Sequence, residues 1–211
     1  MGPEPRDEGL ERIVFFSDGV FAIAITLLVI DLRPPEVLAG LSEAAFLEAM
    51  SELGPKIVAY LLSFAVIGLY WLAHWRRFHF IVRSNERFAV LNLLVLGAIS
   101  FIPFPTALIG SQGDRPISVV IYAVTLSAAG LLGTVSWLYA RRAGLTREGL
   151  SPAYVRSSVA RGLSVPVVML GSLVLLPFIG PYATELSWVL IFVAQAVIVR
   201  AFPAGDPFAT G

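Results

Sequence analysis

The stretch Arg12-Ile-Val-Phe-Phe-Ser-Asp-Gly-Val-Phe-Ala-Ile-Ala-Ile-Thr-Leu-Leu-Val-Ile30 is almost wholly apolar and long enough to cross a bilayer. Ser17, Asp18 and Thr26 nevertheless lie inside it. An ionised carboxylate at membrane depth costs about 2.5–3.5 kcal/mol on insertion scales, so Asp18 is expected to face protein or water and to find a partner. We therefore expect this helix to have a function beyond anchoring the chain.

Composition supports a membrane protein and excludes an ordinary soluble domain. Hydrophobic residues make up 57% of the 211 residues, charged residues 14%, and the mean hydropathy is +0.80. A net charge of +0 gives no basic field that would attract nucleic acid. The chain has no cysteine, which excludes disulfides, iron–sulfur sites and thiol nucleophiles. The acidic, proline-rich start and the long first apolar run do not fit a cleavable signal peptide, so the run is expected to be retained.

Apolar runs along the chain predict six membrane-spanning helices, since a bilayer core about 30 Å thick takes roughly 20 helical residues. The predicted spans are residues 13–32, 57–75, 88–109, 117–140, 162–179 and 186–199. The sixth is the shortest, and Trp188 and Arg200 near its ends predict that it crosses with tilt or local thinning of the bilayer. Because the first-helix motif has no second copy, residues 12–202 are expected to form one all-α six-helix unit with tails 1–11 and 203–211.

Cationic residues are distributed unevenly among the connections. Twelve arginines lie in the two tails and in the second and fourth connections, namely Arg6, Arg12, Arg76, Arg77, Arg83, Arg87, Arg141, Arg142, Arg147, Arg156, Arg161 and Arg200. The other side of the membrane receives only Arg33, Lys56 and Arg115. The positive-inside rule therefore predicts that both termini lie in the cytoplasm.

The connection between the first two spans is acidic. Residues 36–53 place Leu38, Leu41 and Leu53 among glutamates, which predicts a short amphipathic helix on the external side, where it would concentrate cations near an entrance. An acidic solvated loop without that role fits the pattern equally well.

Prolines interrupt two of the predicted spans. Pro103 and Pro105 lie in the third span, and Pro166 and Pro177 lie in the fifth. Each removes a backbone donor, so these helices are expected to kink or end there.

One face of the first helix is apolar except for a single hydroxyl. At about 100° per residue, this face carries Gly19, Ile23, Thr26, Leu27 and Ile30. Asp18 falls on the opposite side and is expected to pack against neighbouring helices. A stripe of Ile and Leu is by itself more typical of lipid or helix packing than of a pore.

Polar side chains of three helices are expected to meet at one depth in the inner leaflet. Arg12 is six positions from Asp18 and does not share its face, so the partner of Asp18 must come from another helix. The second span runs inward to His74 and Trp75, and the third starts near Asn92. With Ser17, these donors and acceptors predict an interhelical network that either clamps the helices together or senses protons through Asp18 and His74.

In these motifs the chain resembles the transmembrane protein 175 family of potassium channels. The matching residues are Arg12, Phe16, Ser17, Asp18, Gly19 and Thr26 in the first helix, His74-Trp75 in the second, and Asn92 with Phe101-Ile-Pro-Phe-Pro-Thr106 in the third. The resemblance is strong over the first half of the chain. The second half matches only in the number and length of its apolar spans.

The resemblance implies a homotetramer of six-helix subunits around a pore lined by four copies of the first helix. It implies an apolar constriction at Ile23, with Leu27 and Ile30 further along, and a selectivity role for Ile23 and the Thr26 hydroxyl, near which potassium would bind transiently. The residues implied to hold the pore helix in place are Arg12, Phe16, Ser17, Asp18, His74, Trp75 and Asn92.

These implications give a potassium channel of the bacterial inner membrane with both termini cytoplasmic. Potassium is the expected permeant ion, and membrane lipid and further subunits are the expected partners, without a cofactor or a resident metal. The chain lacks a Thr-Val-Gly-Tyr-Gly loop, so selectivity is not expected from a filter of backbone carbonyls. An apolar ring resists wetting, so Ile23 is expected to close the pore when the ring is narrow.

Other functions fit the sequence less well. An enzyme is not expected, because His74 and His79 lack zinc-site spacing and no nucleophile motif is present. A secondary transporter of a small cation or other solute is the main alternative, since Gly and Pro are frequent in the third and fifth spans, although no inverted repeat is visible. A purely structural protein would leave the hydroxyl on the stripe unexplained.

Overall fold

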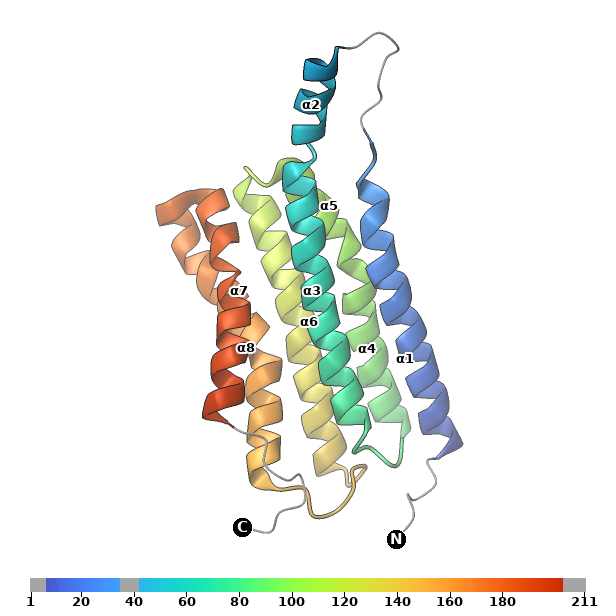
Figure 1. Ribbon diagram of the computed structural model, residues 1–211. Helices are drawn as coiled ribbons and strands as arrows, with labels where there is room; N and C mark the ends of the chain where they lie inside the picture. Colours follow the sequence, from blue (N-terminus) through green and yellow to red (C-terminus); the bar gives the residue numbers. More distant parts are fainter. Residues whose placement is uncertain (1–6, 35–41, 203–211) are drawn as a thin grey trace.

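The computed structural model describes residues 7–34 and 42–202, and these fold as a bundle of long helices (Figure 1). The elements in chain order are α1 (Glu8–Leu27), the 3-10 helix η1 (Leu28–Asp31), α2 (Glu43–Ser51), α3 (Gly54–Phe78), α4 (Glu86–Phe101), α5 (Pro103–Gln112), α6 (Pro116–Arg142), α7 (Pro152–Ser187) and α8 (Leu190–Ala201). Within the described residues, five helical segments are long and apolar enough to cross a membrane, and α8 is a shorter apolar helix. The predicted all-α membrane fold is therefore confirmed.

The first span is longer at its N-terminal end than the predicted 13–32. Its helix begins at Glu8, because the carboxylate of Asp7 caps it by accepting a hydrogen bond from the Gly9 amide at 3.3 Å. Residues 8–11, which the sequence assigned to a tail, are thus helical. The rest of the N-terminal tail, residues 1–6, lies outside the described residues.

The third span is broken where the prolines predict it. Helix α4 ends at Phe101, and α5 starts at Pro103, with Ile102 between them. Proline is well tolerated in the first turn of a helix, so the chain restarts its helix at this point. Helices α4 and α5 together cover the predicted span 88–109.

The fifth span differs more from its prediction of 162–179. Helix α7 begins ten residues earlier, at Pro152, so Arg156 and Arg161 lie on the helix and not in a connection. Pro166 and Pro177 lie inside α7 and do not end it. The chain instead turns at Gly180, whose φ of 75° and ψ of 174° suit glycine because it has no Cβ.

The sixth span is a short helix. Helix α8 has 12 residues, about 18 Å of rise, and returns from the Gly180 turn toward the end where α1 begins (Figure 1). Trp188 does not anchor it at a membrane surface. Its side chain is buried, stacks on Tyr122 at 4.8 Å between ring centroids, and donates from Nε1 to Ser172 Oγ at 2.9 Å.

The segment predicted as an external amphipathic helix forms α2 over part of its length. Ser42 caps the helix at its start, and residues 35–41 lie outside the described residues. None of the residues of α2 is buried in the subunit, and the helix projects beyond the bundle at the start of α3 (Figure 1).

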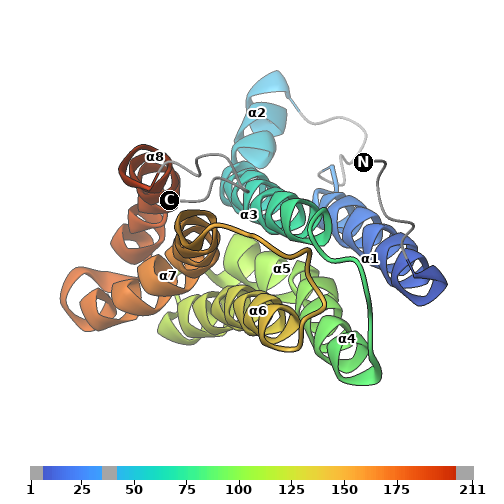
Figure 2. The ribbon, with the colours of Figure 1, turned by 90° about the horizontal axis from the view of Figure 1, so that it is seen from below.

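Helix α6 forms much of the centre of the subunit and packs against α4, α5 and α7. The view along the bundle shows α1 at one edge, beside α3 and α4, and α8 at the opposite edge (Figure 2). Helix α1 therefore has one face against the subunit and one face that the subunit leaves uncovered.

A pH-dependent contact fixes the start of α1. Ser84, in the loop before α4, donates to Asp7 Oδ2 at 2.9 Å, and this bond with the Gly9 amide lowers the pKa of the Asp7 carboxyl. A carboxyl whose pKa is lowered in the folded state stabilises the fold at pH values above its unfolded-state pKa. This stabilisation is lost as the pH falls through the folded-state pKa. We expect the melting temperature of the wild type to fall more steeply below about pH 4 than that of Asp7→Asn, in pH-dependent thermal unfolding. Parallel curves would contradict this role.

Candidate functional site

The buried residues of α1 and of η1, which continues it, form a regular stripe. Leu10, Ser17, Phe21, Ala24 and Leu28 are each at most 2% exposed, and their spacing of three, four or seven residues places them on one side of the helix. This side packs on α3 and α4. Small residues in the stripe, Ser17 and Ala24, allow the helices to approach closely, as is usual for helices in membranes.

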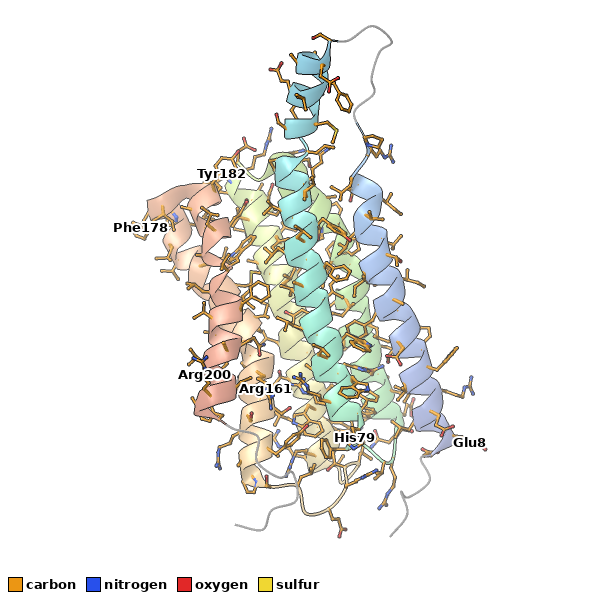
Figure 3. The ribbon with its side chains drawn as sticks, in the orientation of Figure 1. Glu8, His79, Arg161, Phe178, Tyr182 and Arg200 are labelled. Carbon is orange, nitrogen blue, oxygen red and sulfur yellow. The ribbon has the colours of Figure 1, made fainter. Side chains whose placement is uncertain are left out.

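The stripe predicted as the pore face lies opposite. Ile23 is 60% exposed, Leu27 40% and Ile30 54%, and Thr26 is also exposed. The sticks of α1 project from the outer edge of the bundle along its length (Figure 3). The subunit thus presents these side chains to whatever lies beside α1.

The hydroxyl of Thr26 is oriented by its own helix. Its Oγ1 donates toward the backbone oxygens of Ala22, at 3.0 Å, and Ile23, at 2.9 Å. The hydroxyl hydrogen is therefore used by the helix, and the lone pairs of the oxygen remain free to accept. At Thr26 this face of the helix therefore presents an oxygen and not a hydrogen.

Three of the predicted network residues form one directional chain of hydrogen bonds. His74 Nε2 lies 3.1 Å from Asn92 Oδ1, Asn92 Nδ2 donates to Ser17 Oγ at 2.9 Å, and Ser17 Oγ donates to the Ile13 backbone oxygen at 2.7 Å. Since Asn92 Oδ1 is an acceptor, the His74 Nε2 must carry the proton. The chain joins α3, α4 and α1 at a single depth.

Aromatic packing fixes His74 in this position. Its ring stacks on Phe78 with centroids 3.9 Å apart and an interplanar angle of 20°, and it contacts Phe21 of α1 at 5.4 Å. The imidazole therefore has a fixed orientation for its bond to Asn92.

Asp18 is exposed in the subunit and not buried among the neighbouring helices as expected, and its partner is one that the sequence did not predict. Its Oδ1 accepts a hydrogen bond from Trp71 Nε1 at 3.0 Å. Helices α1 and α3 run in opposite directions. A residue that follows Ser17 on α1 therefore lies at the same depth as a residue that precedes His74 on α3. Trp71 lies one turn before Trp75 on the same side of α3, and this spacing is the sequence signal that would have identified it.

The remaining predicted members lie outside the network. Trp75 is 58% exposed, Phe16 is 54% exposed, and Arg12 is also exposed. These three side chains belong to the surface of α1 and α3 that the subunit leaves uncovered. The exposed residues Ile23, Thr26, Leu27 and Ile30, which we call the Ile23 stripe, belong to the same surface. No group of His, Asp and Glu among the described residues is arranged to hold a metal ion.

Comparison with known proteins identifies a single family. The family described as the endosomal/lysosomal potassium channel TMEM175 matches residues 12–103. A potassium channel of Chamaesiphon minutus is 35% identical over 144 residues, 67% of this chain and 70% of that protein. A potassium channel of Streptomyces collinus is 34% identical over 137 residues, 63% of this chain and 65% of that protein.

A solved structure supports the same relationship over the whole bundle. The crystal structure of a lysosomal potassium-selective channel TMEM175 homolog from Chamaesiphon minutus superposes with a TM-score of 0.73 and 28% identity. The match covers 91% of this chain and 99% of that one. The helices of the second half, which carry no motif, thus follow the same fold.

Proposed function

This chain belongs to the TMEM175 family, and from that premise we propose that it forms a potassium channel with a central pore lined by α1 of each subunit. The observation that carries the proposal is the position of the Ile23 stripe. It lies opposite the buried face of α1, on the helix at the edge of the bundle (Figure 2). When the α1 helices of four subunits face one symmetry axis, they enclose a pore lined by Ile23, Thr26, Leu27 and Ile30.

The apolar side chains of the stripe form the constriction in this proposal. Ile23 is the most exposed of the three apolar residues and precedes Leu27 by one turn. A narrow ring of isoleucine methyl groups excludes water and closes the pore to hydrated ions. When the ring widens, partial dehydration favours potassium, because sodium holds its water more tightly.

The hydrogen-bonded chain holds α1 in position while the ring opens and closes. Ser17 is fully buried, and Asn92 and His74 reach it from two other helices. Interhelical hydrogen bonds of this kind contribute about 0.6–2 kcal/mol each in membranes. We assign these residues to positioning of α1 and the uncovered Arg12, Phe16 and Trp75 to the surface that neighbouring subunits or lipid cover.

Asp18→Asn is expected to weaken the contact between α1 and α3, because a neutral amide accepts less strongly from Trp71 than a carboxylate does. We expect a loss of about 1 kcal/mol, seen as a lower melting temperature and less assembled protein in size-exclusion chromatography. Trp71→Phe should reproduce the effect, and Asp31→Asn, at an exposed position, serves as control. An intact assembly with a shifted pH response would instead favour a sensing role for Asp18 with His74.

We also propose a membrane orientation, which the arginines and the path of the chain support. Helix α1 begins and α8 ends at the same end of the bundle (Figure 1). The excess of arginine at that end supports cytoplasmic termini and a position in a bacterial inner membrane.

Flux through the purified protein in liposomes tests the proposal. We expect potassium to leave the vesicles down its gradient faster than sodium, with caesium as a further control, and single-channel events in planar bilayers. Saturable, substrate-coupled flux without channel currents would contradict the proposal and favour the secondary transporter.

A further inference from the structure

A buried arginine lies at the cytoplasmic end of α3. Arg77 is only 7% exposed, and its guanidinium donates from Nε to Ser158 Oγ at 3.3 Å and from Nη2 to the Ser158 backbone oxygen at 3.0 Å. A Cβ at position 162 would overlap Arg77 Nη2 and Thr134 Oγ1. Gly162 therefore leaves the space on α7 that the guanidinium fills.

A second guanidinium lies at the same turn of α7. Arg161 donates from Nη2 to Ser157 Oγ at 2.9 Å and from Nε to the Ser157 backbone oxygen at 3.4 Å. Because Ser157 precedes Ser158 in the chain, the two arginines are held by adjacent residues. Arg161 lies in the lower part of the bundle, the end where Glu8 and His79 also lie (Figure 3).

These arginines line one cavity of about 60 Å³, together with Arg76, and Gln195 of α8 lies at its wall. Gln195 Nε2 is fixed by Ser164 Oγ at 2.8 Å and by the Arg161 backbone oxygen at 3.2 Å. Among the described residues, none of those that line this cavity is Asp or Glu. Three arginines thus lie in the wall of one cavity that has no acidic side chain among the described residues. The rest of the wall is mostly apolar, with His74 and Asn92 among its polar members.

Serine oxygens do not neutralise this charge. Arginine stays protonated in proteins, and its guanidinium has five donors, of which Ser158 uses only two on Arg77. The negative end of the α3 dipole offsets part of the charge, since Arg76 and Arg77 lie in its last turn. The positive charge that remains favours an anion in the cavity.

The geometry suits a phosphate group. Guanidinium groups bind phosphate oxygens through paired hydrogen bonds, and basic pockets between transmembrane helices on the cytoplasmic side are typical sites for acidic lipid headgroups. A water molecule needs roughly 15 Å³ of such space, so the cavity has room for about four, comparable with the four oxygens of a phosphate. We propose that this cavity binds an anionic phosphate group through Arg76, Arg77 and Arg161.

Thermal unfolding of the purified protein in detergent tests the proposal. Micelles carry either phosphatidylglycerol or phosphatidylcholine, and a third sample has inorganic phosphate in plain micelles. A ligand that binds the native state stabilises it. We therefore expect the melting temperature of the wild type to rise by about 2–4 °C with phosphatidylglycerol or with inorganic phosphate, whichever the cavity binds. Phosphatidylcholine should give no rise.

Variants tie the shift to the cavity. Arg76→Gln, at an exposed position, should at least halve the shift, and Arg76→Gln with Arg161→Gln should abolish it. Arg142→Gln, an exposed arginine at the same end, should keep the full shift. A rise with phosphatidylglycerol alone assigns the group to a lipid, and a rise with inorganic phosphate assigns it to a free anion. The absence of any rise, or a full rise in both cavity variants, would overturn the proposal.

Discussion

Ile23→Asn is expected to raise the resting potassium flux of the reconstituted protein by about tenfold or more. In the proposed tetramer, four amides in place of four sec-butyl groups would wet the ring at position 23, and a barrier lowered by ~1.4 kcal/mol already increases a rate tenfold. The exposed position of Ile23 in the isolated subunit means that the substitution does not open a cavity in the core. Preference for potassium over sodium should fall as well, because water-filled rings no longer require dehydration.

Potassium and sodium flux from loaded liposomes measures both effects. Ile23→Leu keeps the ring apolar and should retain a low resting flux, which makes it the matched control. If Ile23→Asn keeps both the selectivity and the resting flux of the wild type, Ile23 has no part in the gate.

The second large effect is expected from Thr26. Thr26→Val keeps the shape of the side chain but removes the oxygen that faces outward while its hydrogen is bound to the Ala22 and Ile23 carbonyls. We expect the potassium-to-sodium permeability ratio to fall about three- to tenfold, which corresponds to roughly 0.6–1.4 kcal/mol at the ion. Reversal potentials under bi-ionic conditions measure the ratio.

Thr26→Ser is the control for this prediction, since it keeps the hydroxyl and should keep most of the selectivity. Equal ratios in Thr26→Val and the wild type would exclude a contact between this oxygen and the ion. A lower total flux with an unchanged ratio would indicate a steric role only.

The membrane fold is predictable from sequence because its determinants are local. Apolar runs of bilayer length and arginines between them identify the spans, and Pro103 marks the break between α4 and α5. The turn at Gly180 and the early start of α7 are harder to predict. An apolar helix with internal prolines continues or ends according to its neighbours, and those contacts come from distant parts of the chain.

The candidate site is partly predictable for the same reason. Helical periodicity places Ile23, Thr26, Leu27 and Ile30 on one face, which the structure leaves uncovered by the rest of the subunit. The expected depths of the helices bring His74 and Asn92 to Ser17. Whether Trp71 or Trp75 contacts Asp18, however, depends on the axial offset between α1 and α3, which the sequence does not give.

Arg77 shows where a charge rule is insufficient. Counting arginines places it correctly among the residues at one end of the bundle, yet it does not reveal that the side chain is buried. That burial depends on Ser158 and on the space left at Gly162, which lie more than 80 residues away in the chain. A cavity lined by three arginines therefore becomes visible only in the folded subunit.

In the proposed channel, copies of α1 meet at one axis with Ile23 at the closest approach. The chain has no cysteine, so Ile23→Cys provides one thiol per subunit, and Val167→Cys, on an exposed face of α7, is the matched control. Disulfides form only between cysteines whose Cα atoms approach within about 7 Å. Under a membrane-permeable oxidant in liposomes, we expect Ile23→Cys subunits to be cross-linked on denaturing gels, with loss of potassium flux, and Val167→Cys subunits to stay monomeric. Ile23→Cys subunits that stay monomeric while a lipid-soluble maleimide labels them would contradict this arrangement.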